Sequence, residues 1–285
     1  MRRLLGTLTG TVRFGRGVLA GFLEHDCSTL AAAIAYYALL SIFPLVLAAT
    51  AVGAQFVDET SVLAFLQQTL SLYLPADAVA VVLRNVEEAI WARGTVGTVA
   101  ILTSLWTSSA VAGAARHALN RVWEVSRERV FWRRKLVEIL VTVAVGTILA
   151  ASFLFSIVFS VVERLAPLGA LDVLRAIPGV DVVRVALPAG LTFLGFLVSY
   201  GLLPNRPVHL QRLWPGALGA ATLFELVRRV AFWVIGTFTR YQLVYGSLAG
   251  VVIFLVWAYL AAAIFLLGAE ISRCASRGAS GRNRP

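Results

Sequence analysis

The chain has 285 residues, of which 59% are hydrophobic and only 14% charged, and its mean hydropathy is +0.82. Soluble domains carry roughly 25% charged residues, so this composition leaves too little polar surface for a water-soluble globule. The formal net charge of +10 does not require nucleic acid as a partner, because the cytoplasmic loops of membrane proteins accumulate arginine and lysine. The composition therefore predicts an all-α membrane protein that is surrounded by membrane lipids.

Residues 1–29 form an N-terminal arm. Apolar residues such as Leu5, Leu8 and Val12 recur in it at helical spacing, with arginines between them. No apolar run in the arm reaches the roughly 7–15 residues of a signal-peptide core, so we expect no cleavable signal peptide. The pattern predicts an amphipathic helix on the anionic cytoplasmic surface of the membrane.

Six later apolar blocks are long enough for transmembrane helices, since a hydrocarbon core of ~30 Å needs roughly 20 helical residues. They predict a polytopic helix bundle over residues 30–270. Pro44 should kink the first of these helices, and the fourth block is the shortest and contains Pro188. The expected spans are residues 30–55, 96–118, 136–162, 185–203, 215–236 and 246–269.

Basic residues alternate between the connections of these spans. The N-terminal arm, the second and fourth connections and the C-terminal tail together carry sixteen Arg and Lys residues, against five in the first, third and fifth connections. Basic residues concentrate in cytoplasmic loops. The distribution therefore predicts that the N and C termini are both cytoplasmic, in a multi-pass protein of the cell inner membrane or plasma membrane.

Two segments lie outside the expected bundle. Residues 56–94, the first extracytoplasmic connection, contain two amphipathic helical stretches separated at Pro75. They are too polar to span, so we expect them to rest on the outer face of the membrane or to cap a cavity. Residues 271–285 form a basic cytoplasmic tail that we expect to be disordered. Cys27 and Cys274 lie at the cytoplasmic edge, where reduced thiols are the rule.

Ionisable residues inside a span carry the most functional information. Glu225, Arg228 and Arg229 fall near the middle of the fifth span, and a charge at mid-bilayer costs roughly 2.5–3.5 kcal/mol on insertion scales. Their i, i+3 and i, i+4 spacing lets the carboxylate meet either arginine. One carboxylate and two guanidinium groups leave a surplus positive charge, which suits an anionic ligand or a lipid head group. An ion-paired clasp between helices explains the same residues, and both interpretations stay open.

Polar residues on the first two spans complete the candidate site. Tyr36, Tyr37 and Ser41 lie on the first span, and Thr107 and Ser108 lie on the second. Hydroxyl groups can line a wet cavity, but in membrane helices they more often bond to their own helix or across an interface. Packing is therefore the favoured interpretation, with a greater chance of a cavity at the first span because of its proline.

Other residues predict structural roles. Gly216, Gly219 and Ala220 on the fifth span indicate close helix packing. Glu270, at the end of the sixth span, is placed to pair with Arg273 or with an arginine of another cytoplasmic connection.

No catalytic motif accompanies these residues. His25, His117 and His209 lie in separate segments, with no carboxylate or cysteine at metal-ligand spacing. The sequence contains no phosphate-binding P-loop, no H-E-x-x-H and no G-x-S-x-G. We therefore expect neither enzymatic activity nor a cofactor.

Five motifs occur in order within residues 15–275, namely AYY followed by S-x-F-P, LPN, PG followed by E, YGS and GAE. In this combination the sequence resembles the YihY / virulence factor BrkB family of bacterial membrane proteins. The resemblance implies a six-helix inner-membrane protein, discussed as a virulence or serum-resistance factor and as a transporter. Some members carry the name ribonuclease BN, but metal-dependent nucleases need clustered ligands, and this sequence has no such cluster.

Three functions are weighed on this basis. The favoured one is a transporter, channel or lipid-handling protein with a cavity lined by the first, second and fifth spans and with Arg228 and Arg229 near its centre. The second is a non-catalytic envelope scaffold that binds partner proteins through residues 56–94. A ribonuclease is the least favoured, and a homo-oligomer stays open for each.

Overall fold

The chain is described by a computed structural model over residues 2–53, 95–126, 129–165, 180–206, 208–235 and 249–281, and over 63–64, 67–68, 71, 79–80, 83–84 and 87. No strand occurs among these residues, so the predicted all-α class is confirmed for them. They form seven helices, α1 (Arg2–Glu24), α2 (Cys27–Gly53), α5 (Thr95–Val122), α6 (Phe131–Leu165), α8 (Val180–Leu202), α9 (Leu210–Ile235) and α11 (Ala249–Gly281).

Each expected span falls mainly on one of the helices from α2 to α11. By length and apolar composition, two segments of the described chain are able to cross a membrane, Phe131–Ser152 in α6 and Gly250–Arg277 in α11. A third qualifies if Arg13–Glu24 and Cys27–Ile42 form one bent span. Ala186–Leu202 is apolar but shorter, and charged residues lower the apolar content of α9. The described residues thus contain two or three candidate spans.

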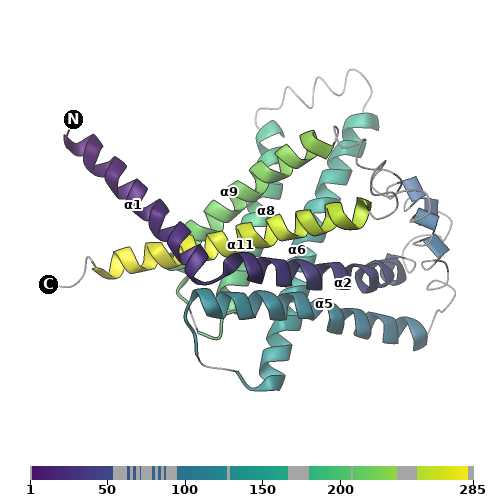
Figure 1. Cartoon of the computed structure of the whole chain (residues 1–285). Helices are drawn as coiled ribbons and strands as arrows, with labels where there is room; N and C mark the ends of the chain where they lie inside the picture. The colour runs from purple at the N-terminus through teal and green to yellow at the C-terminus, as the bar shows by residue number, and fades with distance from the viewer. Residues whose placement is uncertain are drawn as a thin grey trace.

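The six helices from α2 to α11 pack in a closed ring that follows the chain. α2 packs against α5, α5 against α6, α6 against α8, α8 against α9 and α9 against α11, which returns to α2. α1 leaves the ring and contacts α11 and α2. Both ends of the chain project from the same end of the ring, and the described residues between 63 and 87 lie toward the opposite end (Figure 1).

Buried apolar side chains, among those that the structure describes, concentrate at the end from which the termini project, which we call the closed end. They come from the N-terminal halves of α2, α6 and α9 and from the C-terminal halves of α5, α8 and α11. Neighbouring helices of the ring therefore run in opposite directions, as spans joined by short loops do. The core includes Ala31, Leu119, Val141, Leu203, Leu213, Leu266 and Ala269.

Small residues bring α9 and α11 into close contact, as their pattern predicts. A Cβ atom on Gly216 would overlap the carbonyl oxygen of Gly268 and the hydroxyl of Ser272, and one on Gly268 would overlap the Tyr200 hydroxyl. The two backbones approach this closely only because glycine has no side chain. The Tyr200 hydroxyl then donates to the Phe265 carbonyl oxygen (2.5 Å), which joins α8 to the same contact.

α1 and α2 meet at a sharp joint with a bend of 62°. Asp26 adopts a left-handed backbone conformation there, with φ 57°, which aspartate tolerates better than most residues. Its carbonyl oxygen accepts the Leu30 amide (3.1 Å). The joint therefore ends one helix and begins the next within two residues.

Three expectations about the ends of these helices have different outcomes. α2 is one helix through Pro44, and the expected kink stays a prediction. α11 continues to Gly281, so the tail that we expected to be disordered is helical up to that residue. Arg273 and Arg277 of this helix contact Glu124 at the end of α5. Residues 56–94 lie mostly outside the described part of the chain, which leaves their position as a prediction.

Candidate functional site

The charged group in the middle of the chain's fifth expected span consists of Glu225, Arg228 and Arg229, and we call it the α9 triad. Arg228 Nη2 lies 2.7 Å from Glu225 Oε1, and Arg229 Nε lies 3.6 Å from the same oxygen. The exposed fractions of the three side chains are 15%, 37% and 61%. The carboxylate is thus sheltered, while both guanidinium groups are accessible from outside the helix packing.

The triad keeps its surplus positive charge in the structure. Both arginines share one carboxylate oxygen, and the other, Glu225 Oε2, is buried without a hydrogen-bond partner in the described residues. A buried charged oxygen without a partner is costly. Neither ion pair joins α9 to another helix, so these two contacts do not form the clasp between helices that was the alternative interpretation.

The other sequence candidates lie on α2 and α5. Tyr36 and Tyr37 are exposed, and their rings meet edge to face at 5.7 Å. The Ser41 hydroxyl donates to a carbonyl oxygen one turn earlier in its own helix (2.9 Å). Ser108 is buried and Thr107 half-buried. α2 and α5 pack against each other, whereas α9 packs chiefly against α8 and α11, so the eight candidates are divided between two parts of the ring.

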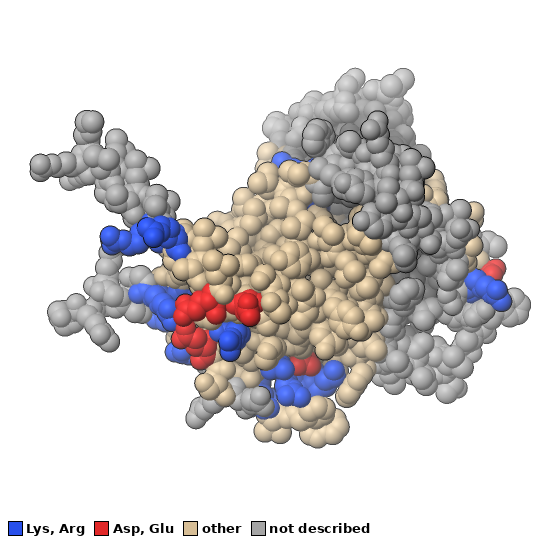
Figure 2. All heavy atoms as spheres, viewed as in Figure 1, with Lys and Arg blue, Asp and Glu red and all other residues tan. Residues whose placement is uncertain are grey.

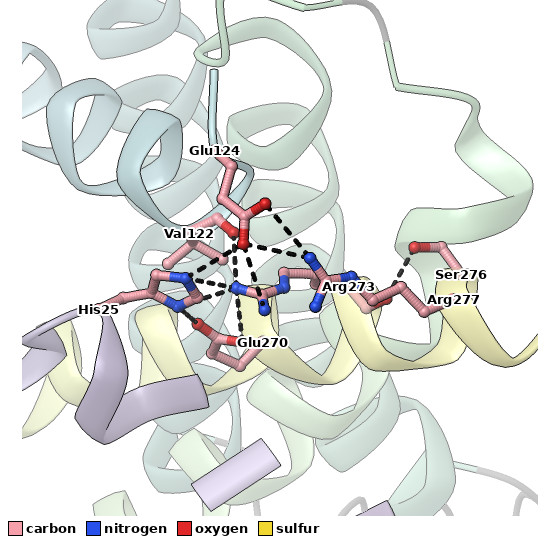
Figure 3. A network of polar contacts seen from close by, with 7 residues as sticks. All are labelled: His25, Val122, Glu124, Glu270, Arg273, Ser276 and Arg277. Atoms are coloured by element: carbon pink, nitrogen blue, oxygen red, sulfur yellow. Dashed lines mark hydrogen bonds and ion pairs between the residues drawn. The ribbon is translucent and has the colours of Figure 1, made fainter. Parts of the chain in front are cut away.

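A larger polar group joins α1, α5 and α11 at the closed end (Figure 3). His25 Nδ1 lies 2.5 Å from Glu270 Oε1, and Arg273 Nη1 lies 2.5 Å from His25 Nε2. Arg273 Nη2 lies 3.5 Å from Glu124 Oε1, and Arg277 Nη2 lies 3.1 Å from the same oxygen. We call these five residues the closed-end network.

The closed-end network is buried around its histidine. His25, Glu270 and Arg273 are 5%, 0% and 7% exposed. His25 Nδ1 faces the Glu270 carboxylate, and Arg273 Nη1 lies 2.9 Å from Nδ1 and 2.5 Å from Nε2, so the guanidinium group approaches both ring nitrogens. Arg273 also donates to the Val122 carbonyl oxygen (3.2 Å). The imidazole of His25 thus lies between a buried carboxylate and a buried guanidinium group, and these contacts connect three helices.

Glu124 enters the network from a constrained position. It has a left-handed backbone conformation, with φ 53°, immediately after α5. The Val125 amide donates to the Asn120 carbonyl oxygen (2.8 Å). This is the hydrogen bond of a Schellman motif that spans six residues, and glycine is the usual residue at the position that Glu124 occupies. Glu124 therefore adopts an unfavourable backbone conformation, and this conformation places its carboxylate against Arg273 and Arg277.

The Glu124 carboxylate is the exposed end of the network. Its slight burial acts to raise its pKa, but the guanidinium groups of Arg273 and Arg277 and hydrogen bonds from Arg277 and His25 outweigh this effect. Together they lower the pKa of the Glu124 carboxyl below its usual range. Glu124 is therefore ionised at neutral and mildly acidic pH.

The network was only partly foreseen from the sequence. The expected pairing of Glu270 with Arg273 is present at 3.8 Å, but the pairing of His25 with Glu270 was not predicted, because folding brings together two residues that are 245 positions apart. The available signal was that both residues are predicted at the same membrane face. Within the described residues, no group of three or more His, Cys, Asp or Glu residues is arranged to hold a metal ion.

The surface agrees with a bundle that lies in a membrane. On the face shown in Figure 2, charged side chains lie around the edge, at the closed end, along one side and at the opposite end, and the middle of the face is uncharged. Large apolar side chains are exposed along the helices, among them Leu140, Leu149, Leu154, Leu194, Val256 and Leu260. Soluble monomers rarely expose so much contiguous apolar surface, so the fold and its surface define an integral membrane helix bundle.

The chain belongs to the virulence factor BrkB family, whose model matches residues 18–285. This confirms the resemblance carried by the five sequence motifs. UPF0761 membrane proteins of Photobacterium profundum and Aeromonas salmonicida are 32% and 30% identical to the chain over 263 and 285 residues, which cover 88% and 95% of this chain and 77% and 93% of theirs. The ribonuclease-like protein YfkH of Bacillus subtilis is 26% identical over 263 residues, which cover 91% of this chain and 94% of YfkH.

Some relatives are longer than this chain. The UPF0761 membrane protein of Nitrosospira multiformis is 30% identical over 268 residues, but the chain spans only 60% of its length. No solved structure matches the chain. The UPF0761 relatives are membrane proteins by name, and the described fold is that of one.

Proposed function

We propose that the chain is an inner-membrane protein that binds an anionic lipid head group at the α9 triad and moves such lipids between the leaflets. The proposal includes six transmembrane helices over residues 30–270, a cytoplasmic amphipathic arm over 1–29 and a cytoplasmic tail over 271–285. It is supported by the closed ring of six antiparallel helices and by the alternating distribution of basic residues. A channel or a transporter of a small anion would use the same charge.

The surplus charge of the triad carries the proposal. Two guanidinium groups stand beside one carboxylate whose second oxygen is buried and unpartnered. Arginine forms bidentate hydrogen bonds with phosphate oxygens, so a phosphate group would neutralise the excess charge. Because the Arg229 side chain is 61% exposed, a ligand can reach it without a change in the helix packing. This accessibility favours a ligand that arrives from the surrounding lipid.

Proteoliposomes test this function directly. The full chain is reconstituted in vesicles that contain phospholipids with a fluorescent head-group label, and a membrane-impermeant reductant reports how fast labelled lipid reaches the outer leaflet. Wild-type protein should accelerate the exchange of phosphatidylglycerol, and R228A/R229A should abolish the acceleration. The matched control is R212A, which removes an exposed arginine near the start of the same helix. Equal rates for wild type and R228A/R229A would contradict the proposal.

We also propose that the chain is not a nuclease, although YfkH carries a ribonuclease-like name. This proposal is supported by the sequence, which has no cluster of metal-binding residues of the kind that a metal-dependent nuclease needs. Purified protein incubated with tRNA precursors and divalent metal ions should leave them intact. Cleavage that persists through successive purification steps would overturn this part of the proposal.

A further inference from the structure

A third charged cluster joins α5 to α6 near the closed end, away from the α9 triad and the closed-end network. Arg116 Nε lies 2.9 Å from Glu138 Oε1, and Lys135 Nζ lies 3.8 Å from Glu138 Oε2. Lys135 also lies 2.5 Å from the Ser109 hydroxyl and 4.2 Å from the centre of the Trp106 ring. We call Arg116, Lys135 and Glu138 the α5–α6 cluster. Two cations share one carboxylate, so the cluster has a net positive charge.

The position of the cluster along α6 suits the depth of a membrane surface. It stands at the beginning of the candidate span Phe131–Ser152. Trp106 and Trp132 beside it are 52% and 75% exposed, and amphipathic aromatic rings are typical of the level of lipid head groups. Arg133, in the first turn of α6, is also exposed and adds a further positive charge at that level.

An apolar stripe begins beside Arg133 and follows the exposed face of α6, whereas Lys135 and Glu138 lie on the face toward α5, with side chains 14% and 7% exposed. Leu136, Leu140 and Val143 are 67%, 57% and 46% exposed. Together with Arg133 they are spaced by three or four residues, so they lie on one face of α6. A positive charge at head-group level, followed by exposed aliphatic side chains that run toward the middle of the span, is complementary to an anionic phospholipid, with its phosphate at Arg133 and an acyl chain on the stripe.

We propose that Arg133 and the apolar stripe of α6 form a binding site for an anionic phospholipid of the leaflet at the closed end, and that the net positive charge of the adjacent α5–α6 cluster strengthens this binding. Glu138 acts as an electrostatic competitor, because its negative charge offsets the two cations that would otherwise attract the phosphate. The site is distinct from the α9 triad and does not depend on lipid movement between leaflets. It retains a lipid at the rim of the bundle.

Because Glu138 offsets the positive charge that attracts the lipid, neighbouring substitutions should change lipid retention in opposite directions. K135M and R133Q each remove a positive charge and should weaken retention of the anionic lipid about fivefold, the effect of one basic residue near an anionic membrane surface. E138Q removes the competing negative charge and should strengthen retention by a similar factor. A purely structural cluster would give the same sign for K135M and E138Q, because each substitution breaks the same ion pair.

Native mass spectrometry of the full chain in detergent provides the measurement. The protein is incubated with equal amounts of phosphatidylglycerol and phosphatidylcholine, and the bound fraction of each lipid is compared across wild type, K135M, R133Q, E138Q and the control R212Q. The series is repeated in the R228A/R229A background, where the α9 triad cannot bind lipid. The preference for phosphatidylglycerol should persist there, so failure of the proposed function and failure of this site are separable.

Arg133 is exposed, so R133Q should fold normally and tests the site even if K135M is unstable. Three results would overturn the proposal: no preference for phosphatidylglycerol in wild type, an R133Q variant that retains as much of it as wild type, or an E138Q variant that retains less. Displacement of the lipid by inorganic phosphate at matched concentration would also overturn it, because the apolar stripe would then contribute nothing.

Discussion

The closed-end network and the α9 triad have similar chemistry and opposite settings. Each places carboxylates beside arginines, but the network links α1, α5 and α11 around a histidine that is 5% exposed, whereas the triad pairs residues of one helix and leaves an arginine 61% exposed. Ion pairs that are buried and shared between helices fix the packing, since a lost partner leaves a buried charge. Pairs that are accessible and local to one helix are free to exchange partners. Burial and connectivity, more than residue type, therefore separate a structural charge from a ligand-binding one.

The largest test of this difference is the removal of one carboxylate from each group. Glu270→Ala leaves Arg273 and His25 buried without their common partner, so we expect a loss of about 3–5 kcal/mol of stability. Glu225→Ala removes an i, i+3 pair that is partly exposed, and the loss should stay below about 1 kcal/mol. Unfolding of both variants in detergent, followed by circular dichroism, gives the two values. Similar losses of stability in the two variants would contradict the distinction between a structural network and a ligand-binding triad.

The next test concerns α1, which the network joins to the ring. A Cβ atom on Gly21 would lie 2.5 Å from Glu270 Oε2, whereas one on Gly15 meets nothing within 4 Å. Gly21→Ala should therefore destabilise the protein by about 1–3 kcal/mol through overpacking. Gly15→Ala should stabilise it by roughly 0.5–1 kcal/mol, since alanine is the better helix former. Limited proteolysis of the α1–α2 joint, together with thermal unfolding, checks both signs, and a stabilising Gly21→Ala would show that α1 does not pack on Glu270.

The same comparison explains what the sequence could reveal. The apolar blocks predicted each helix of the ring to within five residues at its ends, except that α11 continues twelve residues past the expected end, because long apolar runs have only one stable conformation in a membrane. The spacing of Glu225, Arg228 and Arg229 predicted their pairing, since contacts within a helix follow from its period. Gly216 likewise predicted a close helix contact.

Contacts between distant segments were beyond the same reasoning. His25 meets Glu270 only because α1 turns at Asp26 and α11 continues past the expected end of its span, and neither event has a local sequence signal. The burial of the candidates was equally hidden, as Tyr36 and Ser108 show, one exposed and the other buried. A helical period predicts which residues share a face, but not which helix covers that face.

A smaller effect on stability should accompany a clear effect on binding at the α9 triad. Glu225→Gln keeps the shape of the side chain and removes its charge, which frees both arginines for an anion. Stability should change by less than about 1 kcal/mol, and phosphatidylglycerol should bind about fivefold more tightly, the factor expected for one unit of charge at a membrane surface. Lipid binding measured by native mass spectrometry, with Arg212→Gln as control, tests this. Weaker binding would mean that Glu225 positions the arginines and does not compete with the ligand.

The smallest effect concerns the exposed rim of the closed-end network, where Glu124 faces water. Because the pKa of its carboxyl is lowered in the folded protein, the folded state binds a proton less readily than the unfolded one. The contribution of Glu124 is therefore fully present above the ordinary carboxyl pKa of about 4.3 and is lost as the pH falls through the lowered value. At neutral pH Glu124→Gln should be slightly less stable than wild type, and the gap should close as the sample is acidified below that range. Melting temperatures of the two proteins between neutral and acidic pH measure the gap. Since the carboxylate is exposed, salt should narrow the gap at neutral pH, whereas a gap that is independent of both pH and salt would place the role of Glu124 in its strained backbone and not in its charge.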